Sequence, residues 1–416
     1  MRCPKLVGNA SAIVIASLIF LSFVPKAGAE GMRVSASSVF IPSASVGLRY
    51  DDNILFVPED DPVGPQSDLM LLAVPALRFK INKPNIKLNT GYELRTLTYM
   101  DVGDSEESHS KYNAIGHAGD LALVVQTNPG FFVELENATE YRKSTWEEEW
   151  YQRYYPTSQV HADSQVKLGV KRGPYRNLYT YIGYQNIWDY KPERDLSFFD
   201  RIQHRGLLEF NFRFLPRSGF VVKGMVGQVS YPNPADLSRF SPDQWGQLPS
   251  GYGAFFYQGV GGLDSYLTSV LRIKLLGGYA VWDYERSDDY QGFIGEGGLF
   301  LDFEQRGQAS LGYRRVVDDR IMTNYRLSDV VYLDAWALIA RRVKPRLYAA
   351  YHIRSYRGIN SYGENFLTVE PSVWVKLTRR FSSKLTYSYE GMVSSAGGAD
   401  VARTRNAVAL ELLFSF

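Results

Sequence analysis

The chain has 416 residues, with 46 Lys and Arg against 44 Asp and Glu, and a formal net charge of +2. This balance excludes the basic excess typical of a nucleic-acid-binding protein. The mean hydropathy is −0.23, and the one long apolar run lies at the N-terminus, so a bundle of membrane-spanning helices is excluded as well. The 29 Tyr, 23 Phe and 36 Gly suit β-strands with aromatic belts at two membrane interfaces.

The N-terminus has the pattern of a signal peptide. Arg2 and Lys5 form a basic segment, residues 10–24 are apolar, and residues 27–29 supply the small side chains of a cleavage site. We therefore predict a cleaved signal peptide over residues 1–29. A single β-barrel domain is predicted over residues 30–416, because no linker divides them. Cys3, the only cysteine, would leave with the signal peptide.

The rest of the chain is a series of short strands, joined alternately by long loops and tight turns. Residues 86–95 show the pattern most clearly: the even positions are mostly apolar, and the odd positions include Lys87, Glu93 and Arg95. Alternate side chains of a strand lie on opposite faces, so one face suits lipid and the other a water-filled lumen. The same pattern predicts eighteen strands, at residues 43–50, 69–80, 86–95, 114–125, 131–136, 160–168, 178–184, 205–214, 220–230, 252–261, 271–275, 292–303, 308–316, 330–339, 347–356, 366–377, 384–392 and 405–416.

These strands predict an all-β fold, a transmembrane antiparallel up-and-down β-barrel of about eighteen strands, with sixteen or twenty as alternatives. The even count places both termini in the periplasm of a Gram-negative bacterium, with the barrel in the outer membrane. A barrel of this size encloses an aqueous channel. The candidate lumen-lining residues are Lys87, Glu93, Arg95, Glu134, Glu136, His161, Asp163, Arg205, Glu209, Arg213, Arg272, Lys274 and Arg354.

The last twelve residues form the clearest strand end. Val408, Leu410, Leu412, Phe414 and Phe416 alternate on one apolar face, and no polar tail follows them. This resembles the C-terminal strand signal of outer-membrane barrels, which implies that the barrel-assembly machinery and outer-membrane lipid are partners. The alternative is a buried last strand of a soluble sandwich.

Two long predicted loops carry aromatic residues that could contact sugars. Aromatic rings stack on the apolar faces of sugars, and neighbouring carboxylates such as Glu147 accept hydrogen bonds from hydroxyls. The alternative is an interfacial girdle or loop packing. The candidate sugar-contact residues are Trp146, Trp150, Tyr151, Tyr154, Tyr155 and Trp245.

Few residues suggest catalysis or metal binding. The five histidines have no metal-ligand spacing, and His161 with Asp163 only imitates a catalytic pair on one strand face. The acidic residues 51–53 and 59–61 could bind Ca²⁺, but solvated loop side chains are the preferred interpretation. We therefore predict no catalytic residue, no metal and no cofactor.

The segment from Ser45 to Ile54, SVGLRYDDNI, and the segment from Gly91 to Arg95, GYELR, resemble a family of outer-membrane β-barrel porins encoded in exopolysaccharide synthesis and export loci. In that family a Y-D-D-N sequence ends the first strand. The resemblance implies an outer-membrane conduit for a secreted polysaccharide that works with a separate periplasmic export partner. It supplies no catalytic residues. A diffusion porin for small solutes is the second hypothesis, and an outer-membrane enzyme is the third.

Overall fold

A computed structural model describes residues 32–58, 64–102, 108–127, 130–144, 157–172, 177–192, 200–233, 253–285, 289–304, 306–320, 324–357, 361–395 and 401–415. Among these residues, no helix is long and apolar enough to cross a bilayer. One short 3₁₀ helix, η1 (His109–Tyr112), follows the third strand of the wall. The strands are β1 (Met32–Ser35), β2 (Ser38–Asp51), β3 (Asp68–Asn82), β4 (Ile86–Tyr99), β5 (Ala114–Gln126), β6 (Phe131–Ser144), β7 (Thr157–Arg172), β8 (Leu178–Tyr190), β9 (Arg201–Leu215), β10 (Ser218–Ser230), β11 (Ala254–Tyr266), β12 (Leu271–Tyr284), β13 (Tyr290–Asp302), β14 (Gly307–Arg320), β15 (Asn324–Ala337), β16 (Val343–Arg357), β17 (Tyr362–Lys376), β18 (Phe381–Ser394) and β19 (Val401–Ser415).

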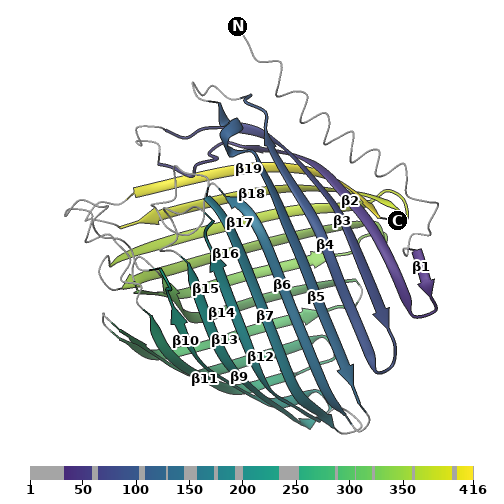
Figure 1. Ribbon diagram of the computed structural model, residues 1–416, viewed down its shortest axis with the longest axis vertical. Coiled ribbons are helices and arrows are strands. Elements are labelled where there is room, and N and C mark those ends of the chain that lie inside the picture. The colour runs from purple at the N-terminus through teal and green to yellow at the C-terminus, as the bar shows by residue number, and fades with distance from the viewer. Residues whose placement is uncertain are drawn as a thin grey trace.

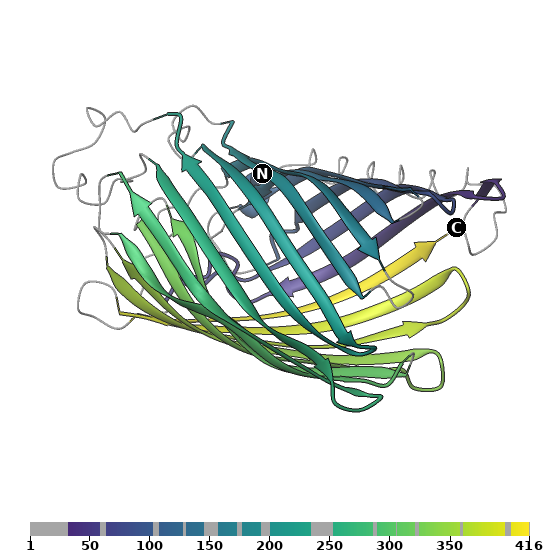
Figure 2. The ribbon, with the colours of Figure 1, turned by 90° about the horizontal axis from the view of Figure 1, so that it is seen from below.

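The strands β2 to β19 close into a barrel. Each pairs antiparallel with its neighbours in sequence, and β19 returns to pair with β2, where Leu410 lies opposite Leu48. The strands β4 to β8 slope one way on the near wall, and β13 to β18 slope the other way behind them, as tilted strands around a barrel do (Figures 1 and 2). The short β1 pairs with the start of β2. The predicted fold class and the count of eighteen wall strands are confirmed.

The tight turns and the longer connections lie at opposite ends of the barrel. Residues 83–85, 216–217 and 377–380 make tight turns at the end that carries β1, whereas residues 52–67 and 231–253 connect strands at the other end. Short turns mark the periplasmic side of an outer-membrane barrel, and long loops mark the extracellular side. The strand predicted over residues 252–261 ends too early, because β11 continues to Tyr266 and pairs there with Arg272.

The outward face of the wall is apolar. On β19, Val408 and Leu410 are 44% and 46% exposed, and their cross-strand neighbours Tyr387 and Leu385 on β18 are exposed as well. Such a face is stable in lipid, because the closed ladder already satisfies the backbone. Among the described residues one ion pair interrupts this face: the guanidinium of Arg315 on β14 holds Asp329 on β15 at 2.8 Å, and the hydroxyl of Tyr313 donates to the same carboxylate.

Of all the wall seams, the one between β13 and β14 has the shortest hydrogen-bonded ladder. These strands pair only where residues 295–302 face residues 308–315, so the extracellular end of β13 has no partner on that side. The extracellular ends of β14 and β15 stay paired to each other, with Val317 opposite Leu327. They form a two-stranded ribbon of residues 316–320 and 324–328, here called the rim ribbon.

Candidate functional site

The candidate site is the lumen of the barrel. All thirteen residues that the sequence nominates as lumen-lining lie on the inward face of their strands, opposite the exposed apolar positions. They fall into two groups around the wall. Lys87, Glu93, Arg95, Glu134, Glu136, His161, Asp163, Arg205, Glu209 and Arg213 lie on β4, β6, β7 and β9, and Arg272, Lys274 and Arg354 lie on β12 and β16.

Most of these charges are paired across neighbouring strands. The ammonium of Lys167 on β7 lies 2.7 Å from Glu134 and 2.9 Å from Glu136, both on β6. Lys167 is not among the predicted site residues, although its odd position puts it on the same strand face as His161 and Asp163. The two acids flank it because Glu134 is its direct cross-strand partner and Glu136 lies one pair further along. The centre therefore carries one cation between two anions.

Further pairs repeat this arrangement around the lumen. Arg95 donates to Glu93 on its own strand and to Glu140 on β6. Arg272 and Lys274 on β12 hold Asp264 on β11 and Glu296 on β13. Glu209 pairs with Lys223 at 3.4 Å. These pairs give a wet, polar wall whose charges largely cancel.

His161 does not pair with Asp163. Its Nδ1 lies 2.7 Å from Asp189 on β8, which also accepts from Arg201, while Asp163 accepts from the amide of Gln185. Two residues that are two apart on one strand share a face, yet each is nearer to its partner on the adjacent strand. The resulting His–carboxylate–guanidinium row is an ion-pair network of the wall.

The first extracellular connection folds into the barrel. Ile54, Leu55, Phe56 and Val57 are at most 2% exposed. The ring of Phe56 meets Phe366 of β17 edge-on, with the centroids 6.3 Å apart. Phe366 lies on the inward face, directly opposite His352 of β16. Residues 52–58, here called the inner loop, therefore fill part of the extracellular end of the lumen.

The Y-D-D-N sequence fixes the inner loop to the last strand. Asp51 is fully buried and accepts from the guanidinium of Arg405 at 2.9 and 3.1 Å. Asp52 accepts from the backbone and side-chain amides of Asn406. Asn53 donates to the carbonyl oxygens of Thr404 and Val57. The interpretation of residues 51–53 as solvated is therefore wrong: their side chains join β2 to β19. Residues 59–61, the other candidate for Ca²⁺, lie outside the described residues.

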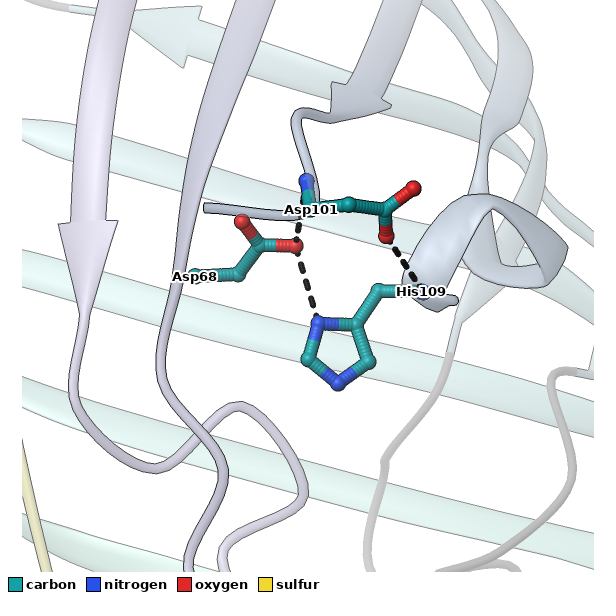
Figure 3. Close-up of side chains that lie close together, drawn as sticks. All are labelled: Asp68, Asp101 and His109. Carbon is teal, nitrogen blue, oxygen red and sulfur yellow. Dashed lines mark hydrogen bonds and ion pairs between the residues drawn. The ribbon is translucent and has the colours of Figure 1, made fainter. Parts of the chain in front are cut away.

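A second anchor holds η1 against β3 (Figure 3). The described residues contain one His and carboxylate group close enough for a metal, formed by Asp68, Asp101 and His109. Each is already engaged: His109 Nδ1 lies 2.9 Å from Asp68, and its Nε2 lies 2.8 Å from Gln66. Asp68 also accepts from the backbone N–H groups of Asp101 and Val102, which follow β4, and Asp101 accepts from the His109 N–H. The group therefore works as a hydrogen-bonded clamp on the loop.

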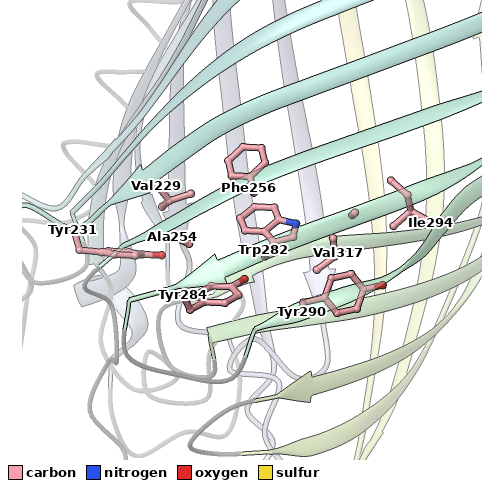
Figure 4. Close-up of a cluster of buried hydrophobic side chains, with 10 residues drawn as sticks. Val229, Tyr231, Ala254, Phe256, Trp282, Tyr284, Tyr290, Ile294 and Val317 are labelled. Carbon is pink, nitrogen blue, oxygen red and sulfur yellow. The ribbon is translucent and has the colours of Figure 1, made fainter.

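The rim ribbon is a second insertion into the mouth. By strand alternation Val317 and Tyr325 share the lipid-facing side of β14 and β15, yet Val317 is buried in a cluster with inward residues of β10 to β13 (Figure 4). Tyr325 packs on Tyr284 and Tyr290, with centroids 5.9 and 5.2 Å away. The ribbon therefore bends inside the wall. Its Asp319 accepts from Tyr231 and lies 4.0 Å from Arg201.

Aromatic side chains line the lumen toward the periplasmic end. Phe132 of β6 stacks on Tyr179 of β8, with centroids 5.6 Å apart and the planes inclined by 7°. Tyr181 meets Tyr179 edge-on, and the ammonium of Lys171 lies 4.5 Å from the Phe132 centroid. We call these three rings the aromatic ledge. The ledge was not predicted, because the candidate sugar-contact rings were all in loops. Those candidates, Trp146, Trp150, Tyr151, Tyr154, Tyr155 and Trp245, lie outside the described residues.

No protein-family model matches the chain. No curated protein matches it either. Among solved structures, it is similar to the siderophore receptor PirA from Pseudomonas aeruginosa, at 10% identity over 92% of this chain and 81% of that one, with a TM-score of 0.46. It is also similar to the FrpB iron transporter from Neisseria meningitidis, at 5% identity over 90% and 81%, with a TM-score of 0.49.

These likenesses are at the level of the fold. A closed antiparallel wall of eighteen strands with an apolar exterior and a charged interior is the architecture of a Gram-negative outer-membrane protein. The protein is therefore an outer-membrane β-barrel with a charged, polar lumen.

Proposed function

We propose that this barrel conducts a polysaccharide out of the cell across the outer membrane, without covalent chemistry. The aromatic ledge is the observation that carries the proposal. It lies on the inward face near the periplasmic end, where a polymer on its way out would enter. The family resemblance of the Y-D-D-N segment points the same way, and export would need a periplasmic partner.

The ledge offers the two kinds of contact that sugars use. The faces of Tyr179 and Tyr181 can stack on the C–H surface of a pyranose ring. Glu209 accepts from the Tyr181 hydroxyl at 3.3 Å, and Lys167 with Glu134 lies on the strands beside it. These groups can exchange their mutual hydrogen bonds for sugar hydroxyls. Each contact is weak on its own, as passage of a moving chain requires.

The second candidate is a diffusion porin for small solutes. The cancelling ion pairs of the wall favour it, because they create no strong field for either sign of charge. The inner loop and the rim ribbon narrow the extracellular mouth in either case. The two functions differ in the size of what passes and in whether a surface polymer depends on the barrel.

The deciding experiment measures polysaccharide at the cell surface and in the periplasm of a deletion strain. Complementation uses the wild-type gene, the double variant Tyr179→Ala with Tyr181→Ala, and the control Tyr184→Ala, whose side chain is on the outward face of the same strand. We expect the deletion and the double variant to lose surface polymer and the control to restore it. Normal surface polymer in the deletion strain would exclude export. Liposome swelling with sugars of graded size would then test the porin.

A further inference from the structure

A cluster of arginines lies on the inward wall of β14 to β16, away from the aromatic ledge. Arg314 on β14 and His352 on β16 both lie opposite Val330 of β15. One pair further along, Ser328 lies opposite Arg354, and Arg326 follows Ser328 on the same face. Alternation puts all of these side chains inward, so the three arginines are the cross-strand and same-strand neighbours of Ser328 and Val330.

Three polar atoms in this cluster are buried without a partner. They are the hydroxyl of Ser328 and the Nε atoms of Arg326 and Arg354. Ser328 is only 4% exposed, so its hydroxyl is covered by its neighbours on the inward face. Buried polar atoms normally have partners, and three neighbouring exceptions indicate a place for a ligand that accepts hydrogen bonds.

The charges of the cluster do not cancel. Arg326 holds Asp318 at 2.8 Å, and Arg354 lies 3.6 Å from Glu364, which also accepts from the hydroxyl of Tyr356 at 2.9 Å. Arg314 is exposed to the lumen and lies opposite Glu296 of β13, whose carboxylate holds Lys274, and no ion pair of Arg314 is found in the described part of the chain. The Arg354 guanidinium lies over the Phe366 ring, 4.8 Å from its centroid. The local excess is positive.

We propose that Arg314, Arg326, Ser328 and Arg354 form a lumenal binding site for an oxyanion, and that its ligand is the carboxylate of an acidic sugar residue in the conducted polymer. Guanidinium groups bind carboxylates through paired N–H donors, and a serine hydroxyl supplies one more donor. This inference rests on the proposed function and narrows it, from polysaccharides in general to those that carry carboxylates. A free phosphate shares the same chemistry and is a separate arm of the test.

The test measures binding to the purified barrel in detergent by isothermal titration calorimetry at low salt. The probes are trigalacturonate, neutral maltotriose and inorganic phosphate. The variants are Ser328→Ala, which removes one hydroxyl from a buried position, and Arg354→Gln. The control is Arg78→Gln on β3, an inward arginine that pairs with Asp120 on the other side of the lumen. Heat-modifiable migration on a gel verifies that each variant is a folded barrel.

We expect trigalacturonate to bind wild-type protein at least about tenfold more tightly than maltotriose. Ser328→Ala and Arg354→Gln should each weaken it by about tenfold, the loss of one charge-assisted hydrogen bond. Arg78→Gln should change it less than about twofold. Equal binding of trigalacturonate and maltotriose, or equal loss in Arg78→Gln, overturns the site.

If phosphate binds and trigalacturonate does not, the ligand is not a sugar carboxylate, and the cluster is a site for free anions. The outcome is independent of the deletion strain. If the variants bind as expected but the deletion strain keeps its surface polymer, the oxyanion site stands and the export role falls. If export fails in the deletion strain but no anion binds, the export role stands and this site falls.

Discussion

The hydroxyl of Tyr231, just after β10, donates a hydrogen bond to the carboxylate of Asp319 on β14, although three wall strands separate β10 from β14. Within a barrel wall a strand is hydrogen-bonded only to the strand on either side of it. This contact between strands that are not adjacent therefore shows that the rim ribbon reaches across the mouth. Arg201 of β9 lies beside the same carboxylate. The ribbon is therefore held inward by polar contacts as well as by the packing of Tyr325.

Tyr231→Phe should release the rim ribbon. It removes a hydrogen bond to a buried carboxylate, an interaction that stabilises by about 1.5–3 kcal/mol. We expect larger or more frequent open events in planar-bilayer conductance. Tyr284→Phe is the matched control, because it removes a buried hydroxyl of the same cluster that has no partner. If the two variants conduct alike, the Tyr231 contact does not hold the ribbon.

Asp51→Ala should destabilise the junction between the first and last wall strands. Asp51 is the nearer of two carboxylates at Arg405, with Glu390 at 3.6 Å, and breaking a buried ion pair by removing one partner costs about 3–5 kcal/mol. We expect a lower urea midpoint in folded vesicle-inserted protein. Asp120→Ala breaks the Arg78 pair, whose side chains are 42% and 39% exposed, and should cost at most about 1 kcal/mol. Equal midpoints for the two variants would contradict a special role for the Y-D-D-N segment.

Charges on the outward face of β19 should block assembly. Leu410→Asp with Leu412→Asp places carboxylates against lipid, where Arg or Lys near the midplane costs about 2–4 kcal/mol and Asp less. Deleting Phe416 tests the assembly signal at the same strand end. Heat-modifiable migration reports folded barrel, and Leu413→Asp, on the inward face of the same strand, should fold. Parental migration of the outward variants would show that this face does not meet lipid.

Single cysteines at positions 208 and 209 should label differently. Leu208 is 49% exposed on the outward face, and Glu209 points inward toward Lys223. Without Cys3 the chain has no competing thiol. A membrane-impermeant thiol reagent should modify Glu209→Cys and spare Leu208→Cys in intact outer membranes. Similar labelling at both positions would reverse or abolish the face assignment.

The strands and their faces were predictable because alternation is local. Residues 86–95 carry their own pattern, and Leu410 and Glu411 need no partner to be assigned to opposite faces. Cross-strand partners were not predictable, since Lys167 meets Glu134 only through the register of β6 and β7. The rim ribbon was invisible for another reason. Val317 and Leu327 fit the lipid-facing pattern, and only the loss of pairing with β13 turns them onto the inner wall.

The short pairing between β13 and β14 has a mechanical consequence. A force that widens a closed barrel pulls on the seam between every pair of adjacent strands. Beyond Gly295 and Arg315 this seam has no hydrogen-bonded ladder to break. The extracellular rim is therefore a split ring, with the end of β13 as one edge and the rim ribbon as the other. Widening the mouth there breaks side-chain contacts, such as the hydrogen bond of Tyr231 to Asp319, and no backbone hydrogen bonds between β13 and β14.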